Sequence, residues 1–391
     1  MRARRTDLLA LGILGLFVVP IAAATMLRQA PPVDLAVYLQ AGRTFVTGGA
    51  LYADAWGSVL AHPLPYTYPP LWAALVAPLS WLDWRATSLA FIVADVALLV
   101  WIVRLSYRRF LDRVGRSRIV LALLVVVLAA TTPIGSVFWF GQVGILLAAA
   151  CLADVVPERT RWPRGVLVGL ATAVKLTPGL FIVYWVATRR WRAAITATAT
   201  SVGLWLLSAA IRPELSREFW TNAIFRTDRV GDPGFVSNQS IYGALVRAGS
   251  AGRAVWVMIA LAALAVGLLR ARDAHRTGDE LAAATIVGLT TLLISPVSWI
   301  DHAVWVVPAS GILLADGRDR RRRLAWAGLV ALFLLRIPDW VADGALPLAG
   351  PLRFVLENAY LWAYAALVVW LPTRDARPVP AYVSADSSSP S

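Results

Sequence analysis

A carboxylate that follows two prolines is the first candidate for chemistry in this sequence. Asp34 opens the segment DLAVYLQAGRTFVTGGALY just after Pro31 and Pro32, from which Val33 separates it, at the end of an apolar run. A carboxyl group held beside apolar helices is partly desolvated, and desolvation makes the carboxylate a stronger base. Proline before aspartate also suits a helix start, so Asp34 could cap a helix, act as a catalytic base, or do both.

One lysine and one histidine could bind a phosphate group. Lys175 is the one lysine beside 36 arginines, and it lies in the apolar run AVKLTPGLF. An ionisable residue within a membrane segment is a candidate functional residue, and a cation there could hold a lipid phosphate. The alternative is a lysine that extends to the membrane interface. His302 follows Trp299 and Asp301 in SPVSWIDH. It could contact a phosphate or orient a base, with Asp301 as its partner, or it could be structural.

Aromatic and amide side chains in three further segments could contact a sugar. Tyr66 and Tyr68 lie in HPLPYTYPPLW and could form a wall against a sugar ring, although aromatic residues also collect at membrane interfaces for other reasons. Asn238 and Gln239 in SNQSIYG could bind hydroxyl groups, or they could begin a helix. Gln142 in GQVG could do the same, or it could serve helix packing.

Motifs for nucleotide and metal chemistry are absent from the sequence. The single lysine follows no glycine-rich turn, which excludes a P-loop, and no Asp-x-Asp pair occurs. Three histidines and one cysteine show no zinc-ligand spacing. We therefore expect neither a metal nor a cofactor. The single cysteine, Cys151, also excludes an intrachain disulfide.

The composition requires a membrane protein. Of 391 residues, 59% are hydrophobic and only 15% are charged, so much apolar surface must face lipid. This excludes a soluble enzyme, a disordered regulator and a secreted disulfide scaffold. We predict an all-α polytopic bundle of about twelve transmembrane helices, near residues 8–27, 86–105, 117–132, 138–156, 165–177, 178–188, 193–211, 252–270, 280–295, 300–315, 324–338 and 353–371.

The net charge of +14 is a topology signal. If the N-terminus is cytoplasmic and the first run is a retained signal anchor, seven short segments on the cytoplasmic side hold 25 of the 37 Lys and Arg residues. These segments are 1–7, 104–118, 157–164, 189–192, 270–276, 317–323 and 372–377. The scattered charge forms no single basic patch, which excludes a nucleic-acid partner.

This topology predicts one transmembrane domain over residues 1–373 with its site on the outer face of the plasma membrane. The long outer loops would be 28–85 and 212–251, and the stretch 69–82 would be an interfacial or re-entrant helix that does not cross. Residues 374–391 are rich in Ser and Pro, which predicts a disordered cytoplasmic tail.

These segments together resemble glycosyltransferase family 87, the polyprenyl-phosphate-mannose-dependent α-1,2-mannosyltransferases of the GT-C superfamily. The resemblance runs from about Pro31 to Pro308 and rests on DLAVY with GGALY, TYPPLWAALVAPLS, WFGQVGILLA, AVKLTPGLF with RRWRAA, SNQSIYG and SPVSWIDH, in this order. It implies that Asp34 is the catalytic base. The family's SPxSW segment often ends in two histidines; here Asp301 replaces the first, and only His302 remains.

The resemblance implies inverting transfer of mannose from polyprenyl-phosphate-mannose to a cell-envelope glycolipid or lipoglycan. Asp34 would deprotonate the acceptor hydroxyl, while Lys175 and His302, helped by Arg226 or Arg229, would neutralise the leaving phosphate without a metal. Three alternatives stay open: an arabinofuranosyltransferase that uses polyprenyl-phosphate-arabinose, a transporter or flippase for a lipid-linked sugar, and a non-catalytic membrane scaffold.

Overall fold

The computed structural model of the protein describes residues 2–53, 64–115, 117–250 and 252–373, so the predicted tail lies outside the described residues. Helices make up the regular structure of this part of the chain, and its one β-type pairing is an isolated bridge between Asn238 and Trp299. The helices up to the middle of the chain are α1 (Arg2–Leu27), α2 (Val33–Thr47), α3 (Pro70–Val76), η1 (Ala77–Trp81), α4 (Trp84–Ser106), α5 (Arg108–Arg113), α6 (Arg118–Ala129), α7 (Thr132–Phe140), α8 (Gly144–Val155), α9 (Val166–Val174), η2 (Thr177–Gly179), α10 (Leu180–Ala187) and α11 (Trp191–Ile211).

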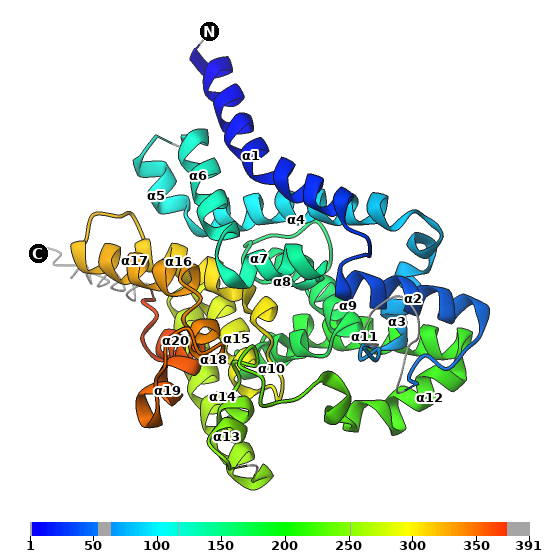
Figure 1. Ribbon diagram of the computed structural model, residues 1–391. Coiled ribbons are helices and arrows are strands. Elements are labelled where there is room, and N and C mark those ends of the chain that lie inside the picture. Colours follow the sequence, from blue (N-terminus) through cyan, green and yellow to red (C-terminus); the bar gives the residue numbers. More distant parts are fainter. Residues whose placement is uncertain (1, 54–63, 116, 251, 374–391) are drawn as a thin grey trace, which may run out of the picture.

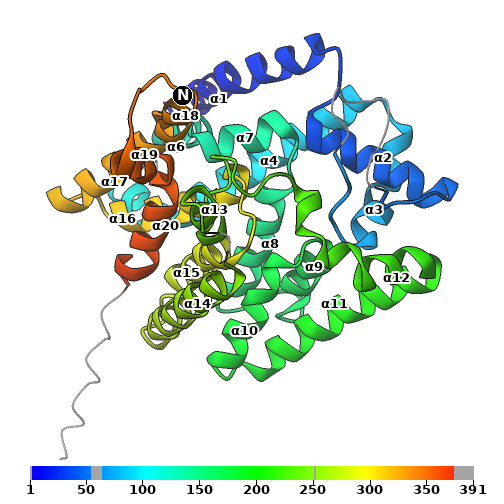
Figure 2. The same cartoon turned by 60° about the horizontal axis from the view of Figure 1, so that its bottom comes forward.

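The second part of the chain continues the bundle. Its helices are α12 (Pro213–Thr221), η3 (Ala223–Phe225), η4 (Thr227–Val230), α13 (Ile241–Arg247), α14 (Arg253–Arg276), α15 (Glu280–Ile294), η5 (Ile300–Trp305), α16 (Val306–Leu314), α17 (Arg320–Leu334), α18 (Ile337–Ala342), α19 (Gly350–Glu357) and α20 (Ala359–Trp370). Figures 1 and 2 show α2, α3 and α12 together at one side of the molecule, α16, α17 and α20 at the other, and α8 between them.

Helix length separates two classes of apolar segment. Four helices of the described chain are long and apolar enough to cross a membrane: α1 over Thr6–Leu27, α4, α11 and α14. Two bent pairs, α6 with α7 at 76° and α19 with α20 at 65°, raise the number of candidate spans to six. The polytopic membrane character is thus confirmed, whereas twelve continuous spanning helices are not found.

The predicted runs 117–132 and 138–156 show why the count differs. The chain turns sharply between α6 and α7, where Pro133 lies in the first turn of α7. Gly141 then adopts a left-handed conformation with φ of 70° and ends α7, so α8 begins a new helix at Gly144. Apolar composition alone does not reveal such breaks, because each short helix is as apolar as a spanning one.

The stretch 69–82 forms a short helical unit. The helix α3 continues directly into η1, and twelve residues cover only about 18 Å as an α-helix, well short of the hydrocarbon core. This unit packs closely against α2, because a β-carbon on Gly42 would lie 2.9 Å from Cα of Ala77. The first long predicted loop therefore contains a compact helical hairpin of α2 with α3 and η1.

A second close approach fixes the end of α9. Gly169 faces α11 so tightly that a β-carbon would lie 2.6 Å from the backbone oxygen of Ala197. The helix ends at Val174, and Lys175 adopts an extended backbone with φ −144° and ψ 132°. Pro178 then begins the next turn, in η2. This break turns Lys175 out of the apolar helix and toward the polar cavity described below.

The contact between Gly288 in α15 and Trp305 gives a test of the packing. A β-carbon on Gly288 would lie 1.9 Å from the Trp305 ring, whereas one on Gly328 in α17 would meet no atom within 4 Å. We expect Gly288→Ala to lower the free energy of unfolding by about 1–3 kcal/mol, because overpacking forces the indole to move. Gly328→Ala should be neutral or stabilising by up to about 1 kcal/mol. Thermal unfolding in detergent measures both, and equal midpoints for the two variants would contradict this packing.

Candidate active site

Residues from six distant segments line one cavity of about 300 Å³. Its walls come from the start of α2, the segment before α3, the turn between α7 and α8, the break after α9, and the loops around residues 223–230 and 295–302. Eight of the side chains predicted from the sequence line it: Asp34, Tyr68, Gln142, Lys175, Arg226, Arg229, Trp299 and His302. The fold thus brings together most of the candidates that the sequence scatters over 269 positions.

Asp34 faces this cavity from the first turn of α2. Pro32 is the residue that caps the helix, and no side-chain cap is made, so the Asp34 carboxylate does not fill the capping role. Burial, and after it the nearby Asp301 carboxylate, raise the pKa of this carboxyl, Lys175 and Gln142 lower it, and the net result is a pKa of about 7. A carboxyl group in this state can accept a proton near neutral pH.

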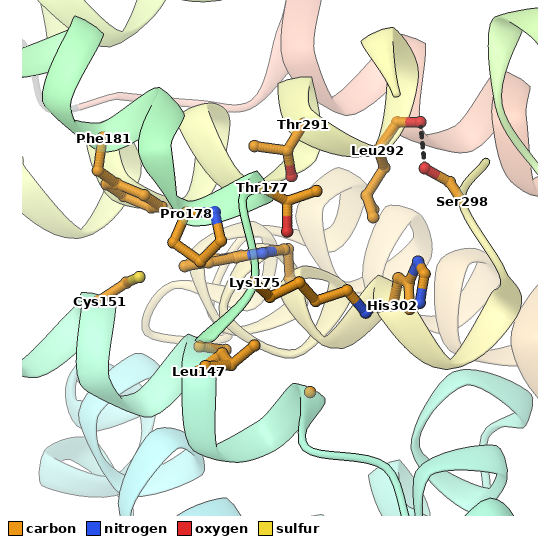
Figure 3. Close-up of a pocket in the computed structure, with 13 residues that line it drawn as sticks. Leu147, Cys151, Lys175, Thr177, Pro178, Phe181, Thr291, Leu292, Ser298 and His302 are labelled. Atoms are coloured by element: carbon orange, nitrogen blue, oxygen red, sulfur yellow. Dashed lines mark hydrogen bonds between the residues drawn. The ribbon is translucent and has the colours of Figure 1, made fainter. Parts of the chain in front are cut away.

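Lys175 extends toward His302, as Figure 3 shows in a smaller neighbouring pocket that both side chains also line. Its Nζ lies 2.9 Å from Nε2 of His302, so the ammonium group donates to a neutral imidazole. It also donates to the Tyr68 hydroxyl at 3.2 Å and lies 5.1 Å from the centre of the Tyr68 ring. The ammonium is therefore fixed by an aromatic face and two polar groups at the cavity wall.

Two tyrosines and a glutamine connect this cation to the base. The hydroxyls of Tyr38 and Tyr68 lie 2.9 Å apart, and both donate to Oε1 of Gln142, at 2.9 Å and 3.2 Å. With its oxygen engaged, Gln142 offers its amide nitrogen to Asp34, whose charged form it favours. Sequence reasoning missed Tyr38. Its signal was the spacing of four residues from Asp34, which places both side chains on one helix face.

Two arginines add positive charge to the lining of the same cavity. Arg226 and Arg229 line the cavity from the segment that follows α12, and Arg229 is buried with Nη2 donating to the Ala53 carbonyl at 3.0 Å. Trp299 lies in the same wall, where its ring contacts the backbone of Gly231 closely. Together with Lys175, these groups give the cavity that Asp34 lines a cationic and aromatic surface.

The remaining predicted site residues lie behind the cavity wall. Asp301 is buried, with Oδ2 at 3.6 Å from Nε2 of His302. Tyr66 is buried and donates to the Pro69 carbonyl at 3.0 Å. Asn238 and Gln239 are fully buried in hydrogen bonds to the protein, and none of these four side chains lines the cavity. The described residues also contain no group of three His, Cys, Asp or Glu side chains that could hold a metal.

Comparison with known proteins places this site in a family. The profile of glycosyltransferase family 87 matches residues 66–296, more than half of the chain. The polyprenol-phosphate-mannose-dependent α-(1-2)-phosphatidylinositol mannoside mannosyltransferase of Mycobacterium tuberculosis is 36% identical over 375 residues, covering 89% of this chain and 86% of the relative. The protein of the same name from Mycolicibacterium smegmatis is 33% identical, covering 86% and 83%.

A second type of relative differs in its acceptor. The polyprenol-phosphate-mannose-dependent α-(1-2)-phosphatidylinositol pentamannoside mannosyltransferase of Mycolicibacterium smegmatis is 33% identical, covering 87% of this chain and 83% of its own. No solved structure matches the chain. Both types of relative match along nearly their whole length, and the family match spans Tyr68, Gln142, Lys175 and Arg226 of the cavity. The chain is a member of glycosyltransferase family 87.

Proposed function

We propose that the protein transfers a mannosyl residue from polyprenyl-phosphate-mannose to a hydroxyl group of a phosphatidylinositol mannoside or a similar cell-envelope glycolipid. The relatives' names state this donor and this class of acceptor. The observation that carries the proposal is that one cavity is lined both by a carboxylate, Asp34, and by the cations Lys175, Arg226 and Arg229. A base opposite a phosphate-binding surface is the arrangement that direct displacement at a sugar carbon requires.

The reaction is one displacement in which all atoms are accounted for. Asp34 accepts the proton of the acceptor hydroxyl while its oxygen attacks the anomeric carbon of the donor. The bond between that carbon and the phosphate oxygen breaks, its electron pair stays on the phosphate, and the configuration inverts. Negative charge grows on the leaving phosphate, where Lys175 and the His302 imidazole stabilise it.

The isoprenoid tail of the donor needs an apolar path next to this cavity. A second cavity of about 450 Å³ lies between α3, α4, α8 and α9 and is lined by apolar side chains that include Trp72, Leu147, Ala150 and Leu167. Its lining includes Val174, the neighbour of Lys175 in the chain. It also includes Trp72, whose ring contacts the ring of Tyr38 edge-on. We place the first isoprenoid units of the donor in this apolar groove.

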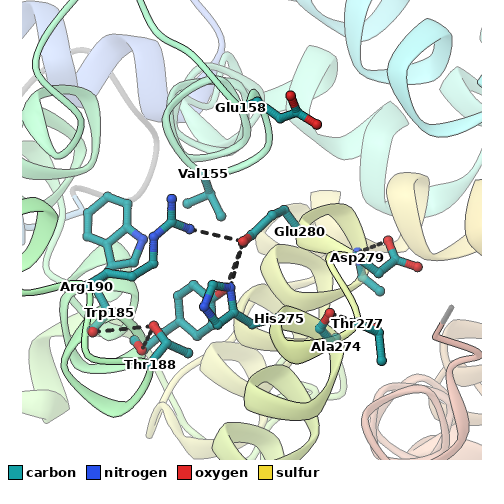
Figure 4. Close-up of polar contacts among 12 residues, drawn as sticks. Val155, Glu158, Trp185, Thr188, Arg190, Ala274, His275, Thr277, Asp279 and Glu280 are labelled. Carbon is teal, nitrogen blue, oxygen red and sulfur yellow. Dashed lines mark hydrogen bonds and ion pairs between the residues drawn. The ribbon is translucent and has the colours of Figure 1, made fainter. Parts of the chain in front are cut away.

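The basic segments support an outer-face position for the cavity. Figure 4 shows Glu280 between Arg190 and His275, with oxygen–nitrogen distances of 3.1 Å and 2.7 Å. Glu280 begins α15, and the other end of this helix, about 20 Å away, leads to Ser295 at the cavity wall. The basic segments 189–192 and 270–276 thus lie at a helix end remote from the cavity, and positive charge favours the cytoplasmic side.

The short apolar helices complete the bundle in this proposal. The helices α8, α10, α15 and α16 are each shorter than a bilayer-spanning helix, and the first three line a small pocket that Lys175 and His302 also line. A GT-C-type bundle with both termini in the cytoplasm would use them as partial or broken spans in the plasma membrane. The outer segments 28–85 and 212–251 then cover the cavity from outside.

A donor assay tests the proposed function directly. Purified protein in liposomes should transfer radiolabelled mannose from polyprenyl-phosphate-mannose to a phosphatidylinositol mannoside, forming a new α-1,2 linkage. Asp34→Asn should reduce turnover at least about 100-fold, because a general base contributes about 10²–10⁴ in rate. Asp112→Asn, in an exposed ion pair with Arg108, is the matched control and should keep full activity.

The same assay separates the alternative functions. Transfer from polyprenyl-phosphate-arabinose in place of the mannosyl donor would establish the arabinofuranosyltransferase. Movement of the donor across the bilayer without a new glycosidic bond would establish a transporter. If the protein neither transfers a sugar nor moves the donor, the non-catalytic scaffold is the alternative that is left. Full mannosyl transfer by Asp34→Asn would contradict the role of Asp34 while leaving the activity in place.

The raised pKa of Asp34 predicts the pH dependence of the reaction. Only the ionised carboxylate accepts a proton, so kcat/KM should rise with pH through about 7 and reach a plateau above it. Below this pH the carboxyl group is protonated and activity should fall about tenfold per pH unit. Initial rates between pH 5 and pH 9 measure the profile. A constant kcat/KM over this range would contradict the assignment of Asp34 as the base.

Filling the apolar groove should weaken donor binding according to tail length. We expect Ala150→Trp to raise KM about tenfold for a long polyprenyl donor, because the indole occupies the space of the tail. A short citronellyl-phosphate-mannose should be affected little. Ala199→Trp, on an exposed face of α11, controls for a bulky residue in the bilayer. Equal KM changes for both donors would place the tail elsewhere.

A further inference from the structure

A third cavity, of about 590 Å³, shares no lining residue with the catalytic cavity. Its walls come from residues 234–236, α13, the end of α18 and α19. The Phe235 ring is 58% exposed there, although it is large and apolar. Phe354, Asp343, Arg353 and Glu357 supply the other ligand-facing groups. No role in the displacement reaction explains this set of residues.

The wall of this cavity is rigid. Arg247 donates from Nη1 to the Phe235 carbonyl at 2.8 Å and from Nη2 to the Asn238 carbonyl at 2.9 Å, and it also binds the Asn358 side chain. This arginine is therefore committed to holding the loop against the start of α20. The backbone that carries Phe235 is fixed before any ligand arrives, which lowers the entropic cost of binding.

The polar groups of the cavity favour an uncharged ligand that is rich in hydroxyls. Arg353 and Glu357 form an ion pair at 2.7 Å that uses only Nε and Oε1 within the described chain, so further donors and acceptors on both groups face the cavity. With Arg247 committed, the remaining charges are one cation and two carboxylates, including Asp343. Counting the charge that Arg247 keeps, the lining carries two cations and two carboxylates, so a phosphate would meet no net positive charge, whereas a sugar can stack on an aromatic ring and bind groups of both signs.

The third cavity and the catalytic cavity share one wall. Val230 lines the catalytic cavity and Phe235 the third one, and five residues of chain span at most about 18 Å. Gln239 joins the two sides, because its backbone nitrogen donates to the Ser298 carbonyl at 2.9 Å and its Nε2 donates to the Glu357 carbonyl at 2.7 Å. An acceptor glycan of several sugars can therefore reach from one cavity to the other.

We propose that the third cavity binds the sugar units of the acceptor that lie away from the reacting hydroxyl. This inference rests on the proposed mannosyl transfer and deepens it, because it makes the length of the acceptor glycan a determinant of specificity. The reacting sugar lies beside Asp34, and the distal sugars stack on Phe235 and bind Arg353 and Glu357.

Two acceptors of different length test the proposal. With a phosphatidylinositol mannoside that carries several mannoses, Arg353→Ala and Phe235→Ala should each raise the acceptor KM about five- to tenfold with kcat unchanged. With octyl mannoside, which has one sugar, neither variant should change KM or kcat. Arg353 is 51% exposed, so its removal does not unfold the protein, and Glu357→Gln provides a second, nearly isosteric variant with the same expected pattern.

Arg253→Ala, at the exposed start of α14, is the matched control and should behave as the wild type with both acceptors. Unchanged KM for the long acceptor in all three variants, or an equal rise for both acceptors, would overturn the third cavity as a distal sugar site. Failure of the wild type to transfer mannose to either acceptor would instead overturn the proposed function, so the two failures are distinguishable.

Discussion

The ammonium group of Lys175 imposes the constraint on which the site depends. A lysine within an apolar bundle is costly unless polar groups surround its charge, because transfer of a charge out of water is strongly unfavourable. The bundle meets this cost with three separate breaks in helical structure. The end of α9 frees the Lys175 backbone, η5 presents His302 at 2.9 Å, and the segment before α3 presents the Tyr68 hydroxyl at 3.2 Å. The breaks in helical structure that make the number of membrane spans hard to predict also place the polar groups that surround the Lys175 ammonium.

The same constraint explains why base and cation are joined indirectly. No ion pair joins Asp34 and Lys175 among the described residues; instead Tyr68, Tyr38 and Gln142 connect them through hydrogen bonds of 2.9–3.2 Å. A direct ion pair would lower the basicity of the carboxylate and would occupy the ammonium that the phosphate needs. Neutral linking groups hold both charges in place, and in the proposed mechanism this leaves Asp34 available to the acceptor hydroxyl and Lys175 available to the donor phosphate.

Sequence reasoning found the charged members of the site more readily than the neutral ones. Asp34, Lys175 and His302 were conspicuous because ionisable residues are rare in apolar segments, and each lines the cavity. Tyr38 was missed because a tyrosine within an amphipathic helix has many ordinary roles. The polytopic all-helical class followed from composition, but the number of spans did not. The turn at Gly141 and the bend between α6 and α7 depend on tertiary contacts that hydropathy does not encode.

Asn238 and Gln239 show how a polar motif can serve a site without lining it. Each amide is fully buried and makes three hydrogen bonds to the protein: Asn238 to Pro233, Pro296 and Ser298, and Gln239 to Val236, Glu357 and Leu361. Buried amides are stable only when they are satisfied in this way, so the pair fixes the relative positions of the SNQS and SPVSW segments. Trp299 and Phe235, which line different cavities, are both held in place by these two buried amides. Their spacing is therefore set by the amides, and under the proposed function substitutions at these two positions would change acceptor choice while Asp34 keeps its proposed role.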